Sequence, residues 1–144
     1  LLADIDSVVA TCCSIKARIV EQDEFDTGLR MLLNFGHTLG HAVEQHFGYS
    51  CFTHGEGVAI GMYQLTKRTE ELGMTAKGSA ERIKSVLEKY NLPLTAGVEK
   101  AQLLDTMARD KKKNGNSITL IILQQIGEGV LQKVDWQEVP RYLG

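Results

Sequence analysis

Residues 30–44 read RMLLNFGHTLGHAVE, a stretch in which polar residues recur at regular intervals among apolar ones. Its polar members follow one another at steps of four, three, four and three residues, the spacing of one α-helix face. They are Arg30, Asn34, His37, His41 and Glu44. The remaining positions are apolar or small, so we expect a buried helix. Buried polar groups are costly unless they are satisfied, so we predict that this stripe forms half of an active site containing a metal and an anionic ligand.

Two glycines lie inside the same predicted helix, which we expect to run from about Leu29 to Phe47. Gly36 and Gly40 are four residues apart and share a face. Each costs about 1 kcal/mol relative to alanine in a helix interior. Two such losses indicate that another backbone or a ligand comes very close, and the sequence leaves tight helix packing and ligand approach equally open.

Outward from this stretch, the sequence predicts a mainly α, bundle-like domain with a late short strand or hairpin. Apolar residues at helical spacing predict further helices, over residues 1–22, 54–72, 79–90 and 98–109. Thr53 and Glu56 have the spacing of a capping box, which places His54 at the first helical position. Residues 117–123 are β-branched and apolar and predict a strand, with a return strand at 130–134.

The composition is that of an ordinary globular protein. With 144 residues, 43% hydrophobic and 24% charged, the chain fits a single helical domain over 1–144. The net charge of −2 and the 6% aromatic content argue against a nucleic-acid partner.

No apolar run is long enough to span a membrane. The N-terminus lacks the basic region of a signal peptide. It also lacks an initiator Met, so we expect an excised domain, a fragment or a processed chain.

The three cysteines are Cys12, Cys13 and Cys51. An odd count with two adjacent members does not form a disulfide framework. The sequence therefore favours a reducing, cytoplasmic compartment.

Histidines supply the metal signal. His37 and His41 lie four residues apart, which is a moderate signal by itself. His54 opens the next helix, and an antiparallel helix pair would bring it close to them. A catalytic zinc ion usually has three protein ligands, and no third is compelling here: Glu44 and Glu56 are available, but Glu56 also has a capping role. The site therefore looks incomplete within this chain.

Basic residues flank the stripe on both sides. Lys16 borders the apolar face of the first helix, where periodicity favours a rim lysine whose stem packs and whose amine reaches solvent. Residues 110–116 read DKKKNGN and are expected to form a turn-rich loop. Such a loop is either a solvated turn or, over a pocket, an anion clamp.

The central pattern resembles the 3-dehydroquinate synthase family. The pattern is RxxLNFGHTxGHAxE followed by HGEGVAIGM, with Ser14–Ala17 upstream and Asp110–Lys112 downstream. The resemblance covers about Cys12 to Gly127, and other sugar-phosphate cyclases are close relatives. It implies a mainly helical C-terminal domain, with the N-terminal α/β domain that binds NAD absent from this chain.

The resemblance also implies different roles for the residues of the polar stripe. It implies a divalent metal held by two histidines, matching His37 and His54, and by a glutamate upstream of Leu1. We expect zinc, although cobalt also suits such ligands. It implies that three residues contact the substrate phosphate and two contact the substrate carboxylate: Asn34, His41 and Lys112 for the first, Arg30 and Lys16 for the second. The choice between Lys111 and Lys112 stays open. Glu44 has no assigned chemical role, and we expect it to be a structural residue or one that supports the site from behind its ligands.

The implied reaction converts 3-deoxy-D-arabino-heptulosonate 7-phosphate to 3-dehydroquinate and phosphate, with NAD and a divalent metal, in aromatic amino acid biosynthesis. The full-length lyase is expected to be a cytoplasmic homodimer acting on this sugar phosphate. The 144 residues alone are expected to be inactive and to bind zinc weakly. The alternatives are a cyclase for another sugar phosphate and a non-catalytic helical domain that binds metal.

Overall fold

The computed structural model describes residues 4–25 and 28–144, apart from the side chains of residues 109–114. The chain forms two compact units, Leu1–Asn34 and Phe35–Gly144. No helix within the described ranges is long and apolar enough to cross a membrane.

The first unit consists of two helices in contact. They are the α-helix α1 (Ile5–Gln22) and the 3₁₀ helix η2 (Leu29–Asn34). The predicted first helix is confirmed from Ile5 onward, and none of its residues is buried. The Asp23 carboxylate accepts hydrogen bonds from the backbone N–H groups of Gly28 and Arg30, at 2.8 and 3.0 Å. These bonds satisfy donors that the start of a helix leaves unpaired.

The single helix predicted from Leu29 to Phe47 is wrong. The 3₁₀ helix η2 ends at Asn34, and the α-helix α2 (His37–His46) begins after Gly36. Gly36 has a φ of +81°, in the left-handed region, which a right-handed helix cannot contain in its interior. The polar stripe is therefore not one helix face: His37, His41 and Glu44 keep their spacing on α2, whereas Arg30 and Asn34 belong to the other unit.

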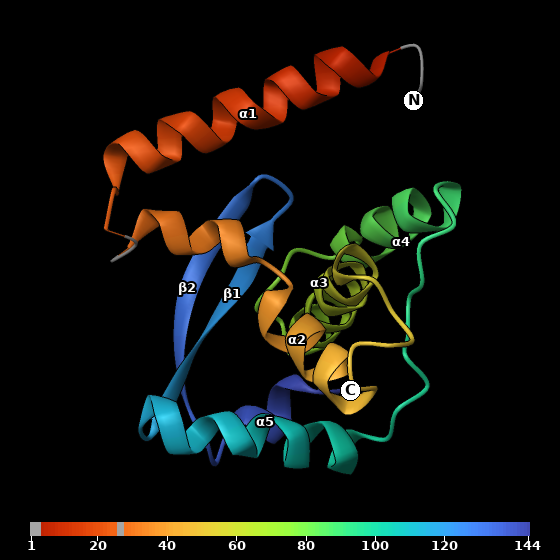
Figure 1. Cartoon of the computed structure of the whole chain (residues 1–144), viewed down its shortest axis with the longest axis vertical. Coiled ribbons are helices and arrows are strands. Elements are labelled where there is room, and N and C mark those ends of the chain that lie inside the picture. Colours follow the sequence, from red (N-terminus) through yellow and green to blue (C-terminus); the bar gives the residue numbers. More distant parts are fainter. Residues whose placement is uncertain (1–3, 26–27) are drawn as a thin grey trace. The chain divides into compact units, whose positions relative to one another are not determined.

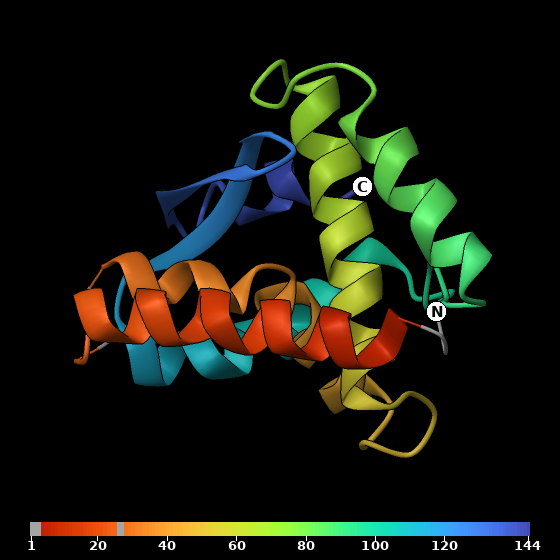
Figure 2. The same cartoon turned by 90° about the horizontal axis from the view of Figure 1, so that it is seen from above.

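In the second unit, helices pack against a late hairpin (Figure 1). Its further elements are α3 (His54–Glu71), α4 (Ser79–Lys89), α5 (Lys100–Asn114), β1 (Ser117–Gln125), β2 (Glu128–Asp135) and η3 (Val139–Tyr142). α2 packs on α3 and on α5, and α4 runs alongside α3 (Figure 2). β1 contacts both α3 and α5. The fold is mainly helical with one two-stranded antiparallel sheet among the described residues, as predicted.

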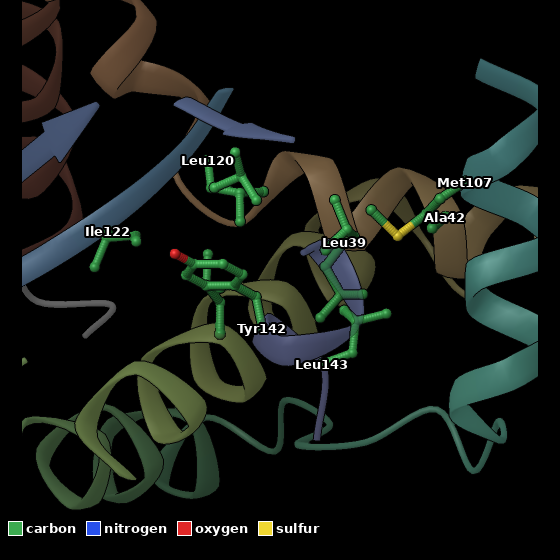
Figure 3. Close-up of a cluster of buried hydrophobic side chains, with 10 residues drawn as sticks. Leu39, Ala42, Met107, Leu120, Ile122, Tyr142 and Leu143 are labelled. Atoms are coloured by element: carbon green, nitrogen blue, oxygen red, sulfur yellow. The ribbon is translucent and has the colours of Figure 1, made fainter. Parts of the chain in front are cut away.

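The core forms where the hairpin meets the helices (Figure 3). β1 pairs with β2 in antiparallel register, with Ile122 opposite Val130. Ile122 packs in a cluster with Leu39 of α2 and Leu65 of α3. The terminal η3 adds Tyr142, which is also buried there. The two predicted strands are confirmed.

The helix α5 is longer than predicted. It continues to Asn114, through residues expected to form a basic loop, and ends at Gly115 with a φ of +78°. The run of lysines is compatible with a helix because lysine is a good helix former. The side chains of Lys111 and Lys112 lie outside the described residues, so the choice between them stays a prediction.

Candidate functional site

The site begins with an unusually close approach of α2 and α3. A Cβ added to Gly40 would lie 2.8 Å from the carbonyl carbon and oxygen of Gly57. A Cβ on Gly61 would overlap the carbonyl oxygen of Gly36. Real Cβ atoms do not approach a backbone this closely, so these glycines let the two backbones touch. Of the two explanations for Gly36 and Gly40, tight packing against a neighbouring helix is therefore the one realised.

The capping box of α3 fixes the third histidine beside this contact. The Thr53 hydroxyl accepts from the backbone N–H of Glu56, and the Glu56 carboxylate accepts from the backbone N–H and the hydroxyl of Thr53. These two donors, the backbone N–H first, hold the pKa of Glu56 below its usual value. The predicted capping box is confirmed, and it sets His54 at the first position of α3.

Three imidazole rings meet where α2 crosses the start of α3. The ring of His54 lies 5.0 Å from that of His37 and 5.3 Å from that of His41, between centroids. The rings of His37 and His41, on successive turns of α2, are 5.7 Å apart. The prediction that an antiparallel helix pair would bring His54 to the other two is confirmed.

The Glu44 carboxylate hydrogen-bonds to two of these rings, those of His41 and His54. Its Oε2 accepts a hydrogen bond from Nδ1 of His41 at 2.8 Å, and its Oε1 accepts from Nδ1 of His54 at 3.2 Å. The Glu44 side chain is only 6% exposed, whereas those of His41 and His54 are 50% and 57% exposed. From the sequence, this residue was expected to have only a structural or supporting role. Its position three residues after His41 was the available signal, but the contact with His54 depends on the helix crossing.

The hydrogen bonds also determine which nitrogen of each imidazole ring carries the proton and which keeps a lone pair for a ligand. Nδ1 of His37 lies 3.3 Å from the carbonyl oxygen of Phe35, so all three Nδ1 atoms face an oxygen that only accepts. We therefore assign the proton to each Nδ1. Nε2 of these rings makes no hydrogen bond to any described residue.

This donor set fits a divalent ion. Imidazole nitrogens with a carboxylate are typical ligands of zinc and of several other first-row metals. One candidate set is His41, Glu44 and His54, whose donor atoms all lie within 4.8 Å of one another. The other is the predicted pair of His37 and His54. The two sets share His54. They differ in the second histidine, His41 or His37, and in whether Glu44 is itself a ligand.

The remaining predicted residues are not part of the described side chains of the second unit. Lys16 is exposed on α1, and Asn34 is exposed at the end of η2. The guanidinium Nη1 of Arg30 donates to the backbone carbonyl of Glu24 at 2.8 Å. All three belong to the first unit, and the Lys112 side chain is outside the described residues. The structure thus brings together His37, His41 and His54, and the roles of all seven predicted site residues stay predictions.

The chain is similar in sequence to 3-dehydroquinate synthases over nearly all of its length. The chain is 46% identical to the 3-dehydroquinate synthase of Clostridium acetobutylicum, over 99% of this chain and 40% of that protein. It is 39% identical to the enzyme of Enterococcus faecalis OG1RF, again over 99% of this chain and 40% of that protein. The chain thus spans about 40% of the length of these relatives.

Solved structures share the fold at low sequence identity. A 2-deoxy-scyllo-inosose synthase complexed with carbaglucose-6-phosphate, NAD+ and Co2+ matches with a TM-score of 0.78 and 19% identity, over 97% of this chain and 40% of that one. ValA, a 2-epi-5-epi-valiolone synthase from Streptomyces hygroscopicus with NAD+ and Zn2+ bound, matches with a TM-score of 0.70 and 20% identity, over 87% and 35%. The helical fold with its late hairpin is therefore the fold of the matching part of these two synthases.

The family described as 3-dehydroquinate synthase C-terminal matches residues 2–113. These residues contain the central pattern, the glycine contact and all three clustered histidines. The chain belongs to the C-terminal family of 3-dehydroquinate synthases.

Proposed function

We propose that this chain is the metal- and substrate-binding part of a 3-dehydroquinate synthase, whose NAD-binding α/β domain precedes residue 1. The enzyme would convert 3-deoxy-D-arabino-heptulosonate 7-phosphate to 3-dehydroquinate and phosphate. The observation that carries the proposal is the convergence of His37, His41 and His54 over the buried Glu44, in a chain of this family. The identity of 46% to a whole enzyme of that activity supports it.

The metal would be zinc or cobalt, held by His37 and His54 together with a glutamate outside this chain. The related structures that contain Co2+ or Zn2+ and the clustered imidazoles support this assignment. When bound, such an ion polarises a substrate oxygen. The chain's contribution is to hold two imidazoles on two helices whose backbones touch, which fixes their separation.

The substrate would be held by its two anionic ends. His41, Asn34 and Lys112 can each donate to a phosphate, and Arg30 presents a planar fork that suits a carboxylate, with Lys16 as its partner. His41 is half-exposed and within 5.7 Å of both other rings, which supports a place beside the metal. Carbaglucose-6-phosphate in one related structure supports a sugar phosphate.

The experiment is a turnover assay of the full-length protein that contains this chain. With NAD and zinc supplied, we expect phosphate release from the heptulosonate phosphate and none from a sugar phosphate that lacks a carboxylate. Turnover of only the second substrate would favour the alternative of a sister cyclase. Lack of turnover with the first substrate, in a protein shown to bind NAD and zinc, would refute the proposal.

Two further expectations accompany this function. The isolated 144 residues would show no turnover and bind zinc weakly, because NAD and one metal ligand belong to the missing part. The full-length protein would act as a homodimer in the cytoplasm. Three free, exposed cysteines support a reducing compartment.

A further inference from the structure

We infer that Glu44 is a positioning residue that sets the ring orientation and the tautomer of both His41 and His54, so that each ring offers Nε2 to its ligand. The inference rests on the proposed function for what those ligands are, a metal ion at His54 and a phosphate at His41. The hydrogen bonds themselves are independent of that function.

The first observation is where the carboxylate is held. Glu44 is 5% exposed and follows two buried residues of α2, Ala42 and Val43. Its side chain lies across Gly57 of α3, where an added Cβ would come within 3.1 Å of the Glu44 Cγ. A carboxylate removed from water is costly unless its charge is satisfied by hydrogen bonds. A Glu at this place therefore needs partners, and the structure provides two.

The second observation is that the two partners use both oxygens. Oε2 receives Nδ1 of His41 at 2.8 Å, and Oε1 receives Nδ1 of His54 at 3.2 Å. An ionised carboxylate only accepts, so both rings must carry a proton on Nδ1. In a neutral imidazole this leaves the lone pair on Nε2. One buried side chain thereby specifies the same tautomer in two rings on two different helices.

This arrangement matches what a metal-binding histidine requires. The ring nitrogen that binds the ion is determined by the hydrogen bond at the other nitrogen, and an outer carboxylate fixes ring orientation and raises ligand basicity. Loss of such an outer partner typically lowers metal affinity or activity by roughly 10- to 100-fold. The alternative is that Glu44 and the Nδ1 atoms bind the ion directly, which would place the ring protons on Nε2.

The decisive variant is Glu44→Gln. Glutamine has the same shape, but its amide offers one accepting oxygen and one donating nitrogen. Only one imidazole can then donate to it, and the other must turn its Nδ1 into an acceptor. Glu71→Gln is the matched control, because Glu71 lies at the end of α3 in an exposed ion pair with Arg68 and touches none of the three rings.

The measurement is the ring ¹⁵N chemical shifts of the metal-free, full-length protein, labelled at histidine. Signals are assigned by single substitution of His41 and His54. In the unsubstituted protein and in Glu71→Gln we expect Nδ1–H tautomers in both rings. In Glu44→Gln we expect one ring to change to Nε2–H, and zinc affinity measured by calorimetry to fall roughly 10- to 100-fold.

Two results would overturn the inference. One is Nε2–H in both rings of the unsubstituted protein, which would instead make Glu44 a direct ligand. The other is a folded Glu44→Gln protein with unchanged tautomers and unchanged zinc affinity. The first result needs no variant, so the inference stays testable even where Glu44→Gln does not fold. Neither measurement involves substrate, so failure of the proposed reaction would be seen separately, as absent turnover in the unsubstituted enzyme.

Discussion

Gly40 of α2 rests directly on the backbone of Gly57 of α3, and this contact brings the histidines of the two helices together. A methyl group on Gly40 would lie 2.8 Å from the Gly57 carbonyl and 2.9 Å from the backbone nitrogen of Val58. The three nearest heavy atoms are all main chain, so no flexible side chain can move aside to relieve this contact. The distance between His37 and His54 therefore depends on glycine at both position 40 and position 57.

Replacing Gly40 with alanine should force α2 away from α3. Overpacking of this kind typically destabilises a protein by about 1–3 kcal/mol, and we expect that loss in the free energy of unfolding measured with denaturant. Gly55→Ala is the control, because nothing lies within 4 Å of a Cβ added at that position. It should leave stability unchanged or raise it by up to about 1 kcal/mol. Equal stability of the two variants would contradict the contact.

Single alanine substitutions should identify which histidines bind zinc. If His37 and His54 are ligands, removing either from the full-length protein should weaken zinc binding by more than the roughly 10- to 100-fold cost of losing an outer partner. His41→Ala should have a smaller effect on calorimetric zinc affinity. The reverse order, with His41→Ala the more damaging, would favour the set of His41, Glu44 and His54. His46→Ala is the control, because that ring lies edge to face against Phe47 at the far end of α2.

Glu70 should make the packing of α4 sensitive to acid. Its carboxylate, at the end of α3, accepts from the backbone N–H groups of Gly78 and Ala80 at the start of α4, at 2.9 Å each. The N–H of Ala80, followed by that of Gly78, lowers the pKa of Glu70 below its ordinary value of 4.5. A lowered folded-state pKa means that the stabilisation is present above the unfolded-state value and is lost as the pH falls through the folded-state value.

Glu70→Gln should therefore reduce the free energy of unfolding at pH 7 by about 1 kcal/mol, the usual effect of losing a helix cap. The difference from the unsubstituted protein should shrink as the pH is lowered from 5 toward 3. Denaturant titrations across that range measure it, with Glu71→Gln, from an exposed ion pair, as a control of smaller effect. A difference that stays constant with pH would show that Glu70 does not act through its charge.

Ile122 should be the most sensitive position of the hairpin. Its side chain is 2% exposed and packs in the core cluster, so Ile122→Ala should destabilise the protein by about 2–5 kcal/mol through lost burial and a residual cavity. Leu131 on the paired strand is 38% exposed, and Leu131→Ala should cost clearly less. Thermal unfolding of the two variants compares them, and similar melting temperatures would contradict the assigned core.

Patterns that act within a few residues could be predicted from the sequence. The capping box of Thr53 and Glu56 needs only a spacing of three and local hydrogen bonds, so it located His54 at the start of its helix. The β-branched run from Ser117 and the return strand likewise follow from local composition. The central pattern also carried the resemblance to the family that the chain belongs to.

Only the tertiary structure decided the break at Gly36 and the role of Glu44. Spacing counts residues but does not report φ, and a φ of +81° at Gly36 ends the regular repeat that linked Arg30 to Glu44. Glu44 reaches His54 because glycine backbones bring α2 and α3 into contact, a distance that no pattern within one helix contains. The sequence by itself determined which side chains occupy each helix, and the approach of two backbones decided which of them meet.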